Sequence, residues 1–204
     1  AFTGKEYTAY YAKVPTMHLA RAFDFLADAL LHSKFPAAEI KREKGVVVEE
    51  MKMYQDTPME YVSEIFEELL YPNQPAGRLV LGYEDSVRAM TRKDFLDYQA
   101  SQYVAGNSVL CLAGGFDRKE ASQLANKYFA AFRQGQAQGK EPVQERSQRG
   151  PGLLLRTKKT DQTHLCLGWR SFDLLHPARY ALEVLSAIAG GSMSSRLFIS
   201  VRER

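Results

Sequence analysis

Apolar residues recur at helical spacing in the first third of the chain. The spacing predicts a helix over residues 18–32, with these apolar positions on one face: Leu19, Phe23, Leu26 and Leu30. Pro36 is placed to open a second helix over 37–55, because proline is favoured in a first helical turn. Asp56-Thr57-Pro58 interrupts the pattern, and a third helix is predicted over 59–70.

Later helices are predicted from capping residues as well as from spacing. Thr91 with Asp94 and Asp117 with Glu120 resemble capping boxes, and they open helices expected to run to Tyr103 and Phe132, respectively. Towards the end of the chain, Pro177 opens a helix through Ile188, and a last helix is predicted from Ser195 onward.

Short apolar or Tyr- and Thr-rich runs predict strands between these helices. The expected strands are 6–14, 107–113, 153–156 and 164–170. Long helices alternating with short strands indicate an α+β or α/β class.

Residues 133–152 have a different composition, dominated by Gln, Gly and charged residues with few apolar anchors. Such composition predicts a flexible linker and a domain boundary. We therefore divide the chain into residues 1–135, a linker over 136–152, and residues 153–204.

Overall composition narrows the function classes. Hydrophobic residues make up 45% and charged residues 25% of the 204 positions, as in ordinary globular proteins. The net charge of +3 is too small to indicate a nucleic-acid partner. Because no run of about 18 apolar residues occurs, no membrane span is expected. The chain opens at Ala1 rather than Met, so a cut or processed chain is expected, and a cytoplasmic or a periplasmic location stays open.

Cysteine and histidine positions do not indicate a metal site by themselves. Cys111 and Cys166 lie in apolar runs and are expected to be buried small residues, although a disulfide between them stays open. The four histidines are scattered, without a His-x-x-x-His or His-x-x-Glu-His pair.

Glu43 and Glu50 are seven residues apart in the helix predicted over 37–55. That spacing is almost two turns, so both carboxylates fall on one face, separated by roughly 10 Å of rise. One small cation could hardly bind both. Read from the residues alone, they fit a solvated helix face better than one ligand with a supporting carboxylate.

Five segments in order resemble the peptidase M16 family of insulinase- and pitrilysin-like zinc metallopeptidases. They span nearly the whole chain and read AFTGKEYTAYYAKVP (1–15), EIKREKGVVVEEMKMYQDTP (39–58), QPAGRLVLGYEDSV (74–87), YVAGNSVLCLAGGFD (103–117) and GGSMSSRLFISVRER (190–204).

The resemblance implies roles for three residues. Glu50 matches the third zinc ligand of the family, and Glu43 matches its supporting carboxylate. The family's His-x-x-Glu-His motif should lie upstream of Ala1, so this chain is expected to be inactive and essentially zinc-free. Arg202 matches an arginine that binds substrate in the family's second half.

The fold implied by the resemblance is an α/β sandwich of mostly antiparallel sheets packed by helices, in two related but incomplete domains. The implied parent is a zinc endopeptidase acting on extended peptides, with a possible second M16 subunit or homodimer. The alternative is a non-catalytic M16-like subunit that holds substrate or a partner.

Overall fold

The computed structural model describes residues 1–136, 139–145, 147–159 and 161–203. The chain divides into two compact units, Ala1–Cys166 and Leu167–Arg204. Each unit is described by itself below.

The first three long helices lie where the apolar spacing predicts them. Helix α1 spans Leu19–Leu31, α2 spans Ala37–Gln55 and α3 spans Pro58–Leu70. Pro36 precedes α2 and Pro58 is the first residue of α3, which fits the preference for proline where a helix begins.

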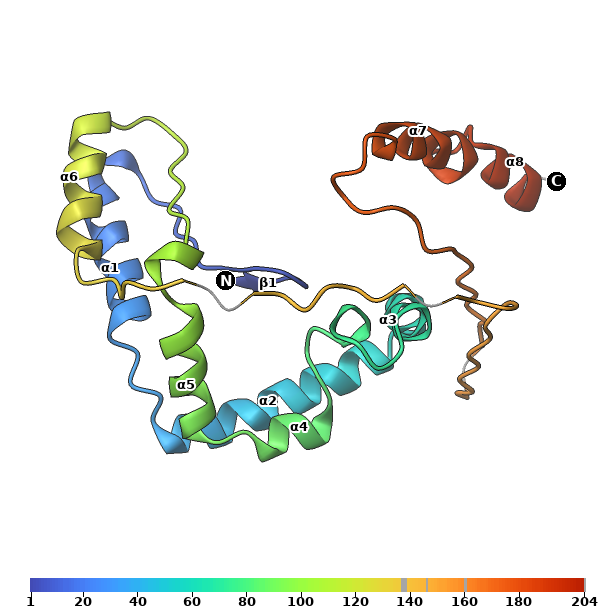
Figure 1. Cartoon of the computed structure of the whole chain (residues 1–204), viewed down its shortest axis with the longest axis horizontal. Coiled ribbons are helices and arrows are strands. Elements are labelled where there is room, and N and C mark those ends of the chain that lie inside the picture. The colour runs from blue at the N-terminus through green and yellow to red at the C-terminus, as the bar shows by residue number, and fades with distance from the viewer. Residues whose placement is uncertain (137–138, 146, 160, 204) are drawn as a thin grey trace. The chain divides into compact units, whose positions relative to one another are not determined.

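Three further α-helices lie in the described part of the first unit (Figure 1). Helix α4 (Glu84–Ala89) was not predicted, while α5 (Arg92–Gln102) and α6 (Arg118–Phe129) confirm the two capped helices. The Asp94 carboxylate accepts hydrogen bonds from both the backbone N–H and the hydroxyl of Thr91. Asp117 caps α6 by accepting from the Glu120 N–H at 2.8 Å.

The strand predictions are mostly wrong. Among the described residues, the sheet consists of β1 (Phe2–Thr3) paired antiparallel with β2 (Thr8–Ala9). Of the strand predicted over 6–14, β2 alone forms, and the other three predicted strands are not hydrogen-bonded into a sheet. A strand needs a neighbour to satisfy its backbone groups, and an apolar run by itself supplies none.

Two small clusters hold the first unit together. In one, α1 packs on α6, with the ring of Phe23 6.5 Å from that of Tyr128 and 6.3 Å from that of Phe129. In the other, Val48 and Met51 of α2 pack against Val87 of α4. The second cluster fixes how α2 is rotated about its own axis.

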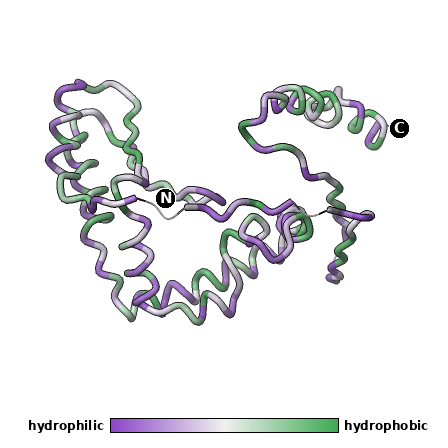
Figure 2. The backbone as a smooth tube through the Cα atoms, in the orientation of Figure 1, coloured by the Kyte–Doolittle hydropathy of each residue, from purple (hydrophilic) through white to green (hydrophobic). Residues whose placement is uncertain are grey.

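The second unit contains two helices, α7 (Arg179–Gly190) and α8 (Arg196–Arg202), which contact each other. The Ser195 hydroxyl caps α8 by accepting from the Phe198 N–H. Figure 2 shows that α7 is rich in hydrophobic positions, and these side chains are largely exposed within the described chain. No helix of the described part is long and apolar enough to cross a bilayer.

Candidate functional site

The glutamates of α2 are positioned by the way this helix is buried. Val48 and Met51 are 2% and 7% exposed and anchor the inner face of the helix. At 100° per residue, Glu43 and Glu50 lie together roughly 120° around the helix from that inner face. Glu50 is half-buried and Glu43 is exposed. The shared face predicted from their spacing is therefore present.

Unlike the neighbouring glutamates, Glu43 and Glu50 have no basic side chain paired with them in the described chain. Glu39 pairs with Arg42 at 2.8 Å, and Glu49 pairs with Lys52 at 2.7 Å and raises the pKa of that lysine through their hydrogen bond. Within the described chain, neither Glu43 nor Glu50 makes an ion pair or a side-chain hydrogen bond.

The reason for this difference is visible in the sequence. Three residues after Glu39 and Glu49 there is a basic residue, whereas three residues after Glu43 and Glu50 stand Val46 and Met53. Side chains at this spacing are neighbours on a helix. Val46 and Met53 are more than half exposed, at 54% and 58%. The two carboxylates thus lie beside uncovered apolar side chains rather than beside cations.

The described residues do not assemble three His, Cys, Asp or Glu side chains into a group that could hold a metal ion. A catalytic zinc site takes three protein ligands and keeps one position open. The described part of this chain therefore does not fit a complete zinc site, although the Glu50 carboxylate is chemically suited to supply one ligand.

Arg202 lies on α8 in the second unit, and α2 is in the first. Its guanidinium carbon is 5.4 Å from the centre of the Phe198 ring, an arrangement typical of a cation–π contact. The side chain is exposed.

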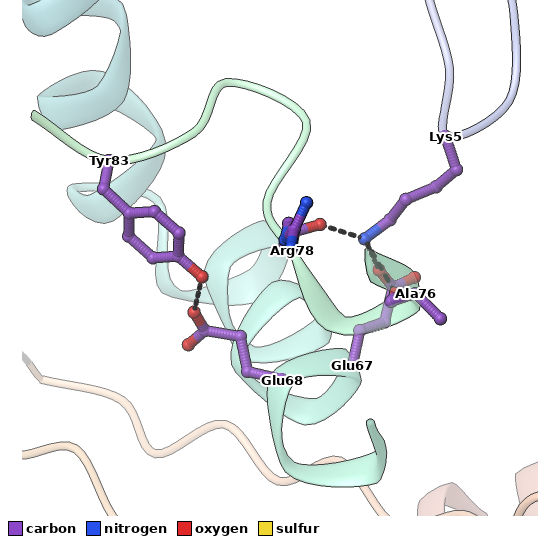
Figure 3. A network of polar contacts seen from close by, with 6 residues as sticks. All are labelled: Lys5, Glu67, Glu68, Ala76, Arg78 and Tyr83. Atoms are coloured by element: carbon purple, nitrogen blue, oxygen red, sulfur yellow. Dashed lines mark hydrogen bonds and ion pairs between the residues drawn. The ribbon is translucent and has the colours of Figure 1, made fainter. Parts of the chain in front are cut away.

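The structure also shows a polar network that the sequence did not predict (Figure 3). Lys5, in the turn between β1 and β2, pairs with Glu67 of α3 at 2.7 Å. The same ammonium donates to the backbone carbonyl of Arg78 at 2.5 Å. On the next residue of α3, Glu68 accepts a 2.6 Å hydrogen bond from the Tyr83 hydroxyl, which raises the pKa of Tyr83.

This network connects the hairpin turn with α3 and with the loop that follows α3. Lys5 and Glu67 are more than 60 residues apart in the sequence. No local sequence signal could therefore have revealed this network. It fixes the β1–β2 hairpin against the helix that directly follows α2.

Two family models match the chain. Residues 1–84 match the model described as insulinase (peptidase family M16), and residues 89–204 match the model described as peptidase M16 inactive domain.

Curated relatives match along the whole chain. The uncharacterized zinc protease YmxG of Bacillus subtilis is 39% identical over 203 residues, which are 100% of this chain and 49% of the relative. Uncharacterized zinc proteases of Mycobacterium leprae and Rickettsia felis are 35% and 33% identical, and the chain covers 46% and 49% of them. The chain thus spans about half the length of the curated relatives it matches.

Solved structures share the fold. The crystal structure of a peptidase M16 inactive domain from Pseudomonas fluorescens has a TM-score of 0.69 at 22% identity, over 90% of this chain and 44% of that one. A protease from Helicobacter pylori has a TM-score of 0.68 at 18% identity, over 91% of this chain and 45% of that one.

Proposed function

The chain belongs to peptidase family M16, and from this premise we propose that it is part of a zinc-dependent metalloendopeptidase that contributes one carboxylate ligand to the metal site. The family resemblance noted in the sequence is thereby confirmed. By itself, we propose, the chain does not hydrolyse peptides, and the activity belongs to a longer parent protein.

One observation carries this proposal: Glu43 and Glu50 share a face of α2 and lack the basic partners that Glu39 and Glu49 have. A carboxylate without a cationic partner keeps its oxygens free to accept another group. A metal ion with its remaining ligands is such a group. We assign the ligand role to Glu50, which is the less exposed of the two, and a supporting role to Glu43.

The distance along the helix separates these roles. Two carboxylates that are roughly 10 Å apart in rise cannot both bind one ion from a regular helix. When bound in a site with three protein ligands, zinc activates water for attack on a peptide carbonyl. Because the described residues do not complete that site, no catalytic step is assigned to this chain.

We propose extended peptides as the substrate class. The β1–β2 hairpin has unpaired outer edges within the described chain, and an extended peptide can add to such an edge as a further strand. Arg202 is assigned to substrate binding, because an exposed guanidinium can donate to a carbonyl or carboxylate of a peptide.

The test uses a version of the protein extended at its N-terminus until it contains a His-x-x-Glu-His motif. In that protein, Glu50→Gln should reduce the zinc content from roughly one ion per chain to near zero and abolish peptide cleavage. Glu43→Gln should keep the zinc and lower kcat by about 10–100-fold.

Glu49→Gln is the matched control, because it alters the adjacent glutamate that already pairs with Lys52. It should leave zinc content and cleavage unchanged. Unchanged zinc stoichiometry in Glu50→Gln would remove this residue from the metal site.

A second candidate is a non-catalytic M16 subunit that holds substrate or a partner chain. It is favoured by the description of the model that matches residues 89–204 as an inactive domain. In this case the extended protein would bind no zinc and cleave no peptide alone. It would instead associate with a second M16 chain or with itself, which sedimentation measurements would detect.

A further inference from the structure

The segment that the sequence predicts as a linker contacts the first unit at widely separated positions. We call the described residues 140–145 and 147–158 the strap. They lie within the first compact unit and belong to no helix or strand. Their contacts reach the hairpin turn, the loop after α3, α3 itself and the C-terminal end of α2.

The middle of the strap is held through its backbone. The side-chain amide of Gln74 donates to the Gln144 carbonyl at 3.3 Å, and the Gln144 N–H donates to the Gln74 side-chain oxygen at 2.9 Å. Both hydrogen bonds involve main-chain groups of the strap. This anchor therefore depends on the side chain at position 74 and not on the one at position 144.

The two ends of the strap are held by lysines. Lys140 pairs with Glu6 of the hairpin turn at 3.1 Å. At the other end, Lys158 pairs with the Asp56 carboxylate and donates to the Gln55 carbonyl at 3.0 Å. These acceptors lie at the C-terminal end of α2, where the helix dipole favours a cation.

Between these anchors the strap passes close to α3. A Cβ atom built on Gly152 would lie 3.3 Å from a methyl carbon of Leu69, closer than most real contacts. The glycine at this position lets the backbone approach the helix.

From these contacts we propose that the strap, residues 140–145 and 147–158, is fastened along the first unit rather than being a free tether. A free flexible chain of this length would have a root-mean-square span of roughly 25 Å or more. A fastened strap removes most of that freedom. This inference stands independently of the proposed peptidase function.

The anchors should respond differently to salt. All four charged side chains of the end anchors are about half or more exposed, and exposed ion pairs are individually weak and screened by salt. The uncharged Gln74 anchor should be insensitive. Raising the salt concentration should therefore loosen the ends of the strap and leave its middle in place.

The test is backbone ¹⁵N relaxation on the full chain. In low salt, we expect order parameters of about 0.85 at residues 143–145 and 153–158. Lys158→Met should lower them below about 0.6 at 153–158, and Gln74→Ala should do so at 143–145. Lys159→Met, which removes the adjacent lysine, is the matched control and should change neither stretch.

Order parameters below about 0.6 along both stretches of the unsubstituted chain would overturn the proposal. Unchanged values in both Lys158→Met and Gln74→Ala would overturn it equally. The amide signals of α2 and α3 report in the same spectra that each variant is folded.

Discussion

Glu64 shows at the residue scale how burial and neighbouring charge act together. Burial raises the pKa of its carboxyl, the nearby Glu67, Glu68 and Glu60 raise it further, and Lys5 partly opposes the effect. A folded-state pKa above the unfolded value means that the protonated form favours folding. This contribution is fully present below the ordinary value of 4.5 and is lost as the pH rises through the folded pKa.

Glu64→Gln should therefore stabilise the protein at pH 7, because it removes a charge that is partly buried among other carboxylates. The side chain is only partly buried, so solvent still screens its charge and the gain should stay below about 1 kcal/mol. Thermal unfolding should show a higher Tm at pH 7 and no difference near pH 3. Glu60→Gln, on the exposed side of α3, should give a smaller gain. A gain that persists at pH 3 would contradict this explanation.

At the element scale, α2 is the helix that matters most, and it carries a glycine in its interior. A Cβ atom built on Gly45 meets nothing within 4 Å. Because alanine restricts the unfolded chain more than glycine does, Gly45→Ala should raise the free energy of unfolding by about 0.5–1 kcal/mol. Urea denaturation would measure this gain as a higher midpoint with an unchanged m-value.

At Gly77, substitution by alanine should have the opposite effect on stability. A Cβ atom there would lie 2.2 Å from the carbonyl oxygen of Tyr71, a backbone atom that cannot easily move. Gly77→Ala should therefore destabilise the protein by about 1–3 kcal/mol. If both alanine variants shifted stability in the same direction, the packing described around one of these glycines would be wrong.

At the scale of the whole molecule, the chain exposes much apolar surface in and before its second unit. Leu165, Leu167 and Trp169 alternate along an extended stretch and are 86%, 77% and 81% exposed. Alternation of this kind is typical of a strand with one face buried. The chain spans about half the length of the curated relatives it matches.

Trp169 is the single tryptophan and reports directly on this surface. In dilute solution, iodide should quench its fluorescence in the native chain as efficiently as in the urea-unfolded chain, because the indole is already exposed. A blue-shifted emission that is protected from iodide would instead show that this stretch is covered, by self-association or by another part of the chain.

Much of the candidate site could be predicted from the sequence. The spacing of Glu43 and Glu50 places them on one helix face, and α2 begins and ends where Pro36 and Asp56 indicate. Their roles as supporting carboxylate and zinc ligand remain predictions, as do the role of Arg202 and the domain limits. The strands could not be predicted in the same way, because their runs lack hydrogen-bonded neighbours within the described chain.

Sequence alone determined the helices other than α4, their caps and the family, because these depend on residues three or four positions apart and on motifs read in order. Only the tertiary structure decided that Lys5 meets Glu67, that Gln74 holds the backbone of Gln144, and that Val48 turns Glu50 away from the core. The first two contacts join residues about 60–70 positions apart, and the third depends on α4 packing against α2. No local pattern encodes such encounters, because they form only when the elements pack together.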